Sequence, residues 1–139
     1  MRVHIIGIGG TFMAGVALIA QQMGFDVVGS DQCLYPPMSD VLAEAAIPVI
    51  EGYDNVPFSS QAYDVIVVGN AISRGNPALE SVLNLGLHYL SGPAFLAEYV
   101  LRHKHVLAVA GTHGKTTTTA LLTWILSQAG KNPGYLIGG

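Results

Sequence analysis

The chain has 139 residues, of which half are hydrophobic and only 11% are charged, so it can bury one ordinary core and is not a disordered chain. Six basic against nine acidic residues give a formal net charge of -3, which excludes the basic surface that attracts nucleic acid or anionic membranes. The single cysteine, Cys33, excludes an internal disulfide and a cysteine-rich metal site, and it is typical of a reducing cytoplasm.

The first predicted elements alternate between strand and helix. Residues 2–6 form a β-type run, and a glycine-rich turn separates them from a mostly apolar helix expected over 13–23. These glycines argue against a membrane span or signal peptide, although residues 3–25 carry no formal charge. A second strand over 26–29 closes a βαβ unit of the kind found in parallel sheets.

The same alternation continues through the middle of the chain. After the Pro36-Pro37 loop we expect a short helix over 39–45 and a weak strand over 48–50. Four β-branched residues at 65–68 predict a buried strand in a central place of the sheet. The pattern therefore remains that of an α/β protein.

Asn76 and Pro77 mark the start of the next helix. The asparagine side chain can cap the first turn, and proline suits a position that needs no N–H. We expect this helix to end at Gly86, followed by a short strand over 88–90 and a helix over 93–101.

The chain is predicted to contain two domains, over 1–105 and 106–139. The strand–helix alternation of the first range predicts a doubly wound, Rossmann-like parallel sheet. In the second range a strand over 106–110 leads into another glycine-rich loop and a helix through 129, and a further strand begins at 135–137. We expect this range to be the beginning of a P-loop ATPase domain that continues beyond the sequence.

The loop that follows residue 110 predicts a site for ATP, because its glycines let backbone N–H groups face phosphate oxygens at a helix N-terminus. Lys115 would bridge the β- and γ-phosphates, and the Thr116 hydroxyl would bind the Mg²⁺ that accompanies ATP. Val109 replaces the first glycine of the full G-x-x-x-x-G-K-[ST] pattern. The histidine in this loop can titrate, but contact through its backbone alone is the simpler interpretation. The expected ATP-binding residues are Gly111, Thr112, His113, Gly114, Lys115, Thr116 and Thr117, with Lys115 and Thr116 as catalytic residues.

The loop after the first strand, at residues 7–12, begins like the dinucleotide fingerprint G-x-G-x-x-G. Phe12 takes the place of the third glycine, which dinucleotide enzymes use for close packing of helix on strand, so NAD is disfavoured. The backbone amides from Gly9 to Phe12 can still hold a diphosphate. Asp31, after the second strand, is placed to accept a hydrogen bond from a sugar or base of the same ligand, unless it only caps a turn.

Polar residues also follow the strand at 65–68, at the edge where open α/β sheets bind ligands. Asn70 and Arg74 are therefore candidate ligand residues. Asparagine and serine are equally ordinary turn formers, so a structural role is the alternative.

These motifs together resemble the Mur ligases, a family that builds and recycles peptidoglycan precursors. The resemblance covers the whole chain and is carried by residues 7–15, 29–31, 76–77 and 109–117. It implies that the first domain binds UDP-N-acetylmuramic acid, and that the second uses ATP and Mg²⁺ to form an acyl phosphate that an amine displaces. The implied UDP-sugar-binding residues are Gly9, Gly10, Thr11, Phe12, Asp31, Asn70 and Arg74.

Within the family, residues 11–13, 35–38 and 69–77 resemble the branch that attaches the tripeptide L-alanyl-γ-D-glutamyl-meso-diaminopimelate during peptidoglycan recycling. Phe12 discriminates, because the branch that adds L-alanine usually has glycine there. The alternatives are that L-alanine ligase, a nicotinamide-dependent enzyme, or a UDP-sugar- or dinucleotide-binding module without ligase activity. The resemblance implies a cytoplasmic enzyme whose amine-binding residues lie beyond Gly139, so this chain alone should be inactive. The oligomeric state stays open.

Overall fold

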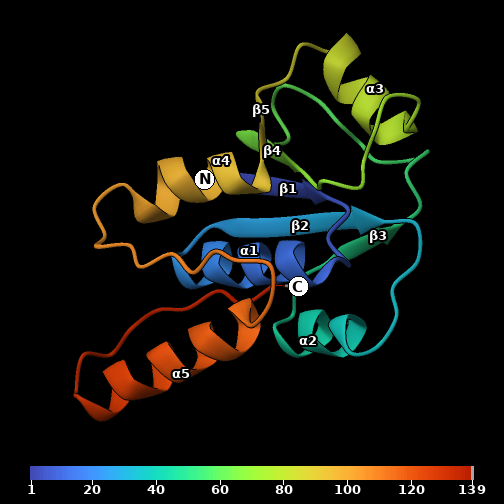
Figure 1. The fold of residues 1–139 in the computed structure, drawn as a ribbon. Coiled ribbons are helices and arrows are strands. Elements are labelled where there is room, and N and C mark those ends of the chain that lie inside the picture. The colour runs from blue at the N-terminus through green and yellow to red at the C-terminus, as the bar shows by residue number, and fades with distance from the viewer. Residues whose placement is uncertain (139) are drawn as a thin grey trace.

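The computed structural model describes residues 1–138, and Gly139, the last residue of the predicted second domain, lies outside the described residues. Five parallel strands form one sheet in the order β3-β2-β1-β4-β5 (Figure 1). The strands are β1 Arg2–Ile6, β2 Asp26–Asp31, β3 Val49–Glu51, β4 Val65–Val68 and β5 Tyr89–Ser91. The predicted Rossmann-like α/β fold is confirmed. The middle strand is β1, while β4, predicted to be central, lies beside it inside the sheet.

The chain order reverses at β1, which makes this strand the switch point of the topology. The chain builds outward from β1 through β2 and β3, and then returns to the other side of β1 for β4 and β5. The loops that leave β1 and β4 therefore diverge at the carboxyl edge of the sheet. Open α/β sheets bind ligands in the crevice that such a divergence creates.

The helices are α1 Thr11–Gln22, α2 Met38–Glu44, α3 Pro77–Asn84, α4 Gly92–Phe95, the π-helical η1 Leu96–Leu101, and α5 Lys115–Gln128. Each lies where the sequence predicts a helix, with ends shifted by a few residues. The helix expected over 93–101 is divided, because its second half widens from α- to π-helical geometry.

One face of the sheet carries the larger core. The strand period of two turns Val3, Ile5, Val65 and Val67 to this face, where all four are buried beneath α1, α2 and α4. Full burial of one such side chain contributes about 1.5–3 kcal/mol. The helix α1 has no side-chain cap, so packing rather than capping holds it in place.

The opposite face carries a smaller core, which α3 and the loop at 52–64 cover. Its buried members are Ile6, Ile66, Ala78 and Val82. The cap predicted for α3 is confirmed, since the Asn76 side chain accepts hydrogen bonds from the backbone N–H groups of Ala78 and Leu79, at 3.0 and 3.3 Å.

His4 points into this smaller core and is fully buried. Its Nε2 lies 2.9 Å from the Ser30 hydroxyl, and its ring packs edge-on against Phe58 and Tyr63. The buried Nδ1 has no hydrogen-bond partner within residues 1–138. Burial lowers the pKa of His4 from 6.5 to about 4, so the imidazole is neutral at pH 7.

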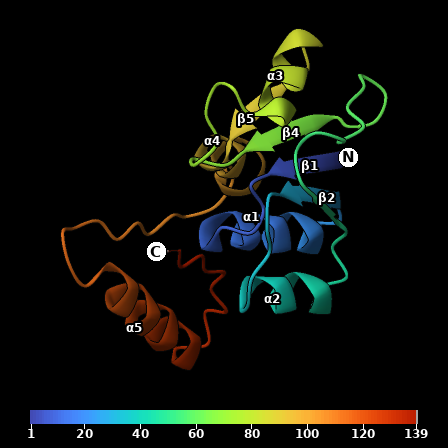
Figure 2. The ribbon, with the colours of Figure 1, turned by 90° about the vertical axis from the view of Figure 1, so that its right-hand side faces the viewer.

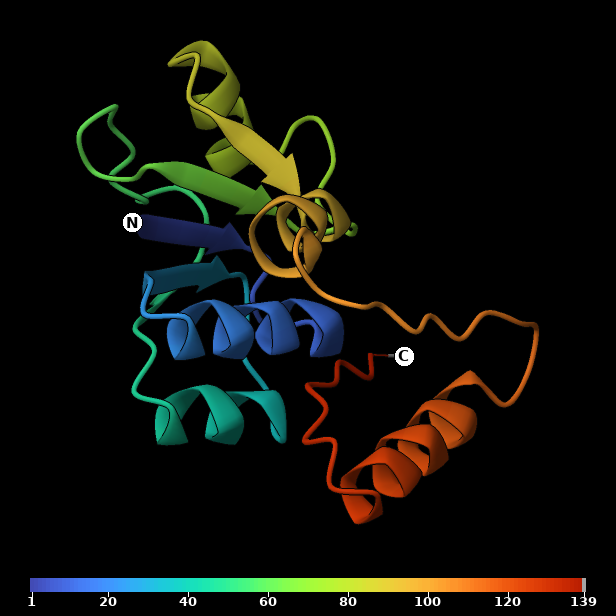
Figure 3. The ribbon, with the colours of Figure 1, turned by 90° about the vertical axis from the view of Figure 1, so that its left-hand side faces the viewer.

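Residues 106–138 add a helix but no strand. Residues 106–110 and 135–137 were predicted to be strands, and this prediction is wrong for the described chain. A strand needs a partner for its backbone hydrogen bonds, and neither segment pairs with another among residues 1–138. The helix α5 buries none of its residues and lies apart from the sheet, and the tail after it returns to the start of α1 (Figure 2 and Figure 3). No helix within residues 1–138 is long and apolar enough to cross a lipid bilayer.

Candidate functional site

A cavity of about 310 Å³ opens at the switch point, between the loops that leave β1 and β4. Gly7 and residues 10–13 line one side, residues 69–72 line the other, and Gly138 completes the lining. The volume is at the lower end of the range for small-molecule sites. Four of the predicted ligand residues share this cavity: Gly10, Thr11, Phe12 and Asn70.

The turn after β1 is held firmly by backbone hydrogen bonds. Gly7 has φ +80°, a conformation that glycine adopts without steric cost. The Ser30 carbonyl accepts hydrogen bonds from the N–H groups of Gly7 and Ile8, at 2.8 and 3.2 Å. Across the cavity, the Gly69 N–H donates to the Ile6 carbonyl at 2.9 Å. The two loops are thus fixed to neighbouring strands before any ligand arrives.

The N-terminus of α1 opens onto this cavity. Its N-cap residue, Gly10, has no side chain to cap the helix, and the first turn contains no acidic residue. The first N–H groups of a helix lack acceptors within the helix, and the helix dipole adds partial positive charge there. This end of α1 is therefore suited to an anion such as a diphosphate.

Asp31 lies next to the cavity and braces the glycine turn. Its Oδ2 accepts a hydrogen bond from the Gly9 N–H at 2.7 Å, and its Oδ1 lies 3.4 Å from the Tyr53 hydroxyl. Burial first, and then the Asp31 charge, raise the pKa of Tyr53, which keeps its hydroxyl protonated as a donor. The Gly9 N–H, predicted to face a diphosphate, is occupied by this carboxylate. Asp31 itself lines a second cavity of about 190 Å³, together with Leu34, Val49 and Glu51.

Arg74 does not line either of these cavities. Its guanidinium forms two hydrogen bonds to the Glu80 carboxylate, at 2.8 and 3.1 Å, and its side chain is 78% exposed. The hydrogen bonds to Arg74 and to the Gly75 N–H lower the pKa of Glu80. The structure therefore places Arg74 in the loop before α3, outside the lining of both cavities.

Phe12 explains how the turn works without the third glycine of the fingerprint. Its ring lies over Gly92, the first residue of α4, where an added β-carbon would stand 2.7 Å from Phe12 Cε1. Gly92 is buried as a result. The close approach that the fingerprint places at the third glycine is provided here by Gly92 on another element.

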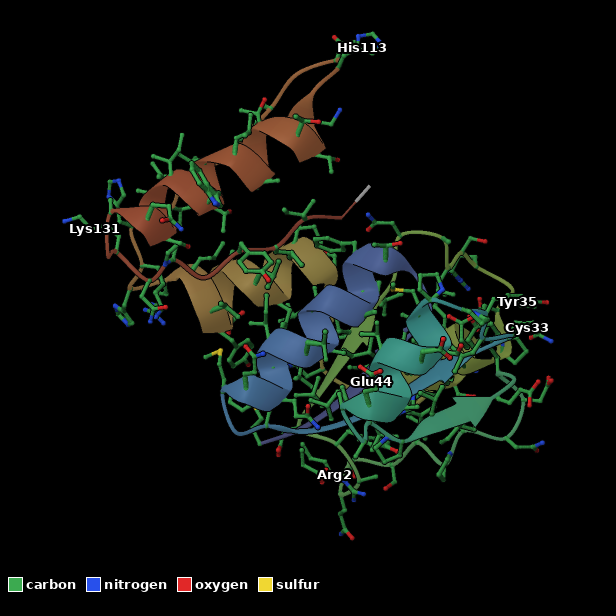
Figure 4. The ribbon with its side chains drawn as sticks, turned by 90° about the horizontal axis from the view of Figure 1, so that it is seen from below. Arg2, Cys33, Tyr35, Glu44, His113 and Lys131 are labelled. Carbon is green, nitrogen blue, oxygen red and sulfur yellow. The ribbon has the colours of Figure 1, made fainter. Side chains whose placement is uncertain are left out.

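The second glycine-rich loop precedes α5 and is exposed. Gly114, the N-cap residue, has φ +78° and provides no side-chain cap, so the α5 N-terminus is also open to an anion. The Lys115 Nζ donates hydrogen bonds to the loop carbonyls of Gly111 and Thr112, at 2.9 and 3.4 Å. Figure 4 shows His113 at the outer tip of this loop, away from the sheet. The Lys115 ammonium thus lies on carbonyls of its own loop.

The residues of this second loop also fit a magnesium ion that arrives with a nucleotide. No group of three His, Cys, Asp or Glu side chains within residues 1–138 is arranged to hold a metal. Mg²⁺ keeps several waters and commonly needs only one or two protein ligands when phosphate oxygens supply others. The Thr116 hydroxyl, in the first turn of α5, is of a suitable type for such a ligand.

Residues 2–104 match the family described as "Mur ligase family, catalytic domain". The chain belongs to the Mur ligase family. Two curated Mur ligases match it over its whole length: the Escherichia coli protein with 53% identity over 100% of the chain, and the Haemophilus influenzae protein with 56% over 99%. Both are named UDP-N-acetylmuramate-L-alanyl-gamma-D-glutamyl-meso-2,6-diaminoheptandioate ligase. The chain spans only 30% of the length of either relative.

A Psychrobacter protein named UDP-N-acetylmuramate-L-alanine ligase is 40% identical over 99% of this Mur ligase chain and is covered over 28% of its own length. Among solved structures, the tripeptide ligase from Neisseria meningitides superposes with a TM-score of 0.93 at 54% identity, over 99% of this chain and 43% of that one. The alanine ligase from Thermotoga maritima superposes with a TM-score of 0.89 at 28% identity, over 100% and 32%. The described arrangement is thus that of known Mur ligases.

Several residues that line the switch-point cavity of this Mur ligase chain were not predicted from the sequence. They are Gly7, Met13, Gly69, Ala71, Ile72 and Gly138. Gly69 had a usable signal, because it ends a buried strand just as Gly7 ends the first one. Gly138 had none, since its place at the cavity depends on contacts with residues far away in the sequence.

Proposed function

We propose that this chain holds the UDP-sugar-binding domain and the start of the ATP-binding domain of a ligase that joins L-alanyl-γ-D-glutamyl-meso-diaminopimelate to UDP-N-acetylmuramic acid. One observation carries the proposal. Two ligases named for that tripeptide are 53% and 56% identical over nearly all of the chain, against 40% for a relative named for L-alanine.

The switch-point cavity is the proposed site of the UDP-sugar. Its diphosphate would lie at the N-terminus of α1, against the backbone of Gly10, Thr11 and Phe12, with Asn70 on the facing loop. Gly9 and Asp31 would act by holding that loop in shape, and the second cavity beside Asp31 offers acceptors for sugar hydroxyls. Arg74 would contact the ligand only after releasing Glu80.

The loop at 111–117 is the proposed site of ATP. The Lys115 ammonium would leave the carbonyls of Gly111 and Thr112 for the phosphates, where it stabilises charge on the transferred γ-phosphoryl group. Bound Mg²⁺, with the Thr116 hydroxyl as one ligand, would neutralise further phosphate charge. His113 and Thr117 would contribute through the loop backbone and the first helical turn.

In the proposed reaction, the lactyl carboxylate of the UDP-sugar attacks the γ-phosphorus, so that an acyl phosphate forms and ADP leaves. The peptide amine then attacks the acyl carbon and loses a proton. The amide bond forms as inorganic phosphate leaves with the electrons of the broken C–O bond. ATP and the free thiol of Cys33 both fit the cytoplasm, which is the proposed location.

The test is ADP release by the full-length enzyme with UDP-N-acetylmuramate, ATP and Mg²⁺, with the tripeptide and L-alanine offered in parallel. We expect the tripeptide to have a kcat/KM at least about a hundredfold higher. A preference for L-alanine would assign the chain to the other branch. Binding of the UDP-sugar without any ADP release would leave only a binding module. Thermal stabilisation by NAD but not by the UDP-sugar would support the dinucleotide alternative.

A further inference from the structure

The tail after α5, residues 135–138, lies against the N-terminal half of α1. The ribbon of this tail returns to the start of that helix in three views (Figure 1, Figure 2 and Figure 3). Leu136 packs against the larger core, although it follows a helix that buries none of its own residues. The tail is thus the part of the second range that the first domain holds.

Two glycines make this contact possible. A β-carbon added to Gly15, in the middle of α1, would collide with Leu136 Cδ1. A β-carbon added to Gly138 would lie 3.0 Å from Phe12 Cα and 3.1 Å from Phe12 Cβ, closer than most real contacts. Glycine is unfavourable inside a helix, so Gly15 is explained by the leucine that occupies the space above it.

Phe12 connects this contact to the switch-point cavity. Its ring lies between Gly92 and Gly138, and both Phe12 and Gly138 line the cavity. Gly15 and Leu136 do not line it. Any movement of the tail would therefore change one wall of the proposed UDP-sugar site, directly at Gly138 and indirectly through Phe12.

We propose that Leu136 in the hollow at Gly15, together with Gly138 against Phe12, locks the ATP-binding part of the chain onto the UDP-sugar-binding domain, and that locking and UDP-sugar binding strengthen each other. Gly15 and Leu136 are positioning residues for the site. The coupling rests on the proposed function, whereas the lock itself does not.

The experiment is a double-mutant cycle in the full-length enzyme, with Gly15→Ala, Leu136→Ala and the double variant. The readouts are the melting temperature and the Kd for UDP-N-acetylmuramate measured by calorimetry. Each single change should raise the Kd about tenfold, a typical coupling between sites. The double variant should bind no more weakly than Leu136→Ala alone. In the Leu136→Ala background, Gly15→Ala should raise the melting temperature, because alanine is the better helix former once the collision is gone.

The control cycle replaces Gly15→Ala by Gln22→Ala, on the exposed part of the same helix, and its effects should add to those of Leu136→Ala. Additive melting temperatures in the first cycle would overturn the lock. A non-additive melting temperature with an unchanged Kd would overturn the coupling and keep the lock. Absence of UDP-sugar binding by the unmodified enzyme would overturn the proposed function, and the melting temperatures would still decide on the lock.

Discussion

The two glycine-rich loops both stand before an uncapped helix, yet they are held in different ways. The loop after β1 is tied to its surroundings by the Ser30 carbonyl and the Asp31 carboxylate, which belong to the neighbouring strand. The loop before α5 is exposed, and its main side-chain contact is the Lys115 ammonium on its own carbonyls. The first loop is held by contacts with the rest of the fold, whereas the second is held by contacts within its own sequence.

This difference predicts that a single side chain matters most in the second loop. Lys115→Ala should lower kcat for ADP release by the full-length enzyme about 100- to 1000-fold, because the ammonium that stabilises charge on the transferred phosphoryl group is lost. The Kd for the UDP-sugar should stay within about twofold, since the two loops are built independently. Lys131→Ala, at the far end of α5 in Figure 4, is the matched control and should leave kcat unchanged. Equal losses in both variants would contradict the role of Lys115.

The first loop should instead depend on pH through His4, which pairs with the Ser30 hydroxyl beneath the turn. The folded pKa of about 4 lies below the ordinary 6.5, so the fold favours the neutral ring. The free energy of unfolding is therefore highest above about pH 7. It falls by about 3 kcal/mol in total as the pH drops from 6.5 toward 4. Urea unfolding of the chain between pH 4 and 8 measures it. The variant His4→Leu should show a flatter pH profile, and an unchanged profile would show that His4 does not titrate in this way.

The brace from Asp31 should have a smaller effect. Asp31→Ala leaves the Gly9 N–H without its carboxylate, which should cost about 1–2 kcal/mol of stability and raise the Kd for the UDP-sugar. Asp31→Asn keeps a side-chain oxygen that can accept the same hydrogen bond, so it should lose less. Chemical denaturation and calorimetry on the three proteins test this order. An equal loss of affinity in Asp31→Asn and Asp31→Ala would indicate that the ligand needs the carboxylate charge itself, and not only the brace on Gly9.

The smallest effect is expected at Arg74, which is exposed and already paired. Glu80→Gln should change the melting temperature very little, because exposed ion pairs contribute little to stability. The same change also weakens the hydrogen bonds that hold the Arg74 guanidinium at residue 80. If Arg74 contacts the UDP-sugar, the Kd should fall slightly in this variant and rise in Arg74→Ala. If both variants have the same Kd as the unmodified enzyme, Arg74 does not contact the UDP-sugar.

The parts of the fold that the sequence predicted correctly are those that depend on neighbours along the chain. The asparagine-proline start of α3, the helix after Lys115 and the strand at β4 all follow from caps, turns and periodic burial within a few residues. The strands predicted at 106–110 and 135–137 have the same local pattern, but a strand also needs a partner. The residues of these two segments alone therefore could not determine whether they form strands.

The sequence by itself determined the α/β class, the family and the two glycine loops, because β-branched runs, helix caps and glycine turns act over short distances. Only the tertiary structure decided that Asp31 occupies the Gly9 N–H, that Gly92 supplies the space the third glycine usually provides, and that Leu136 sits on Gly15. These pairs are far apart in the chain. The packing of the whole core determines which side chains come into contact. Such contacts therefore cannot be predicted from a local sequence pattern.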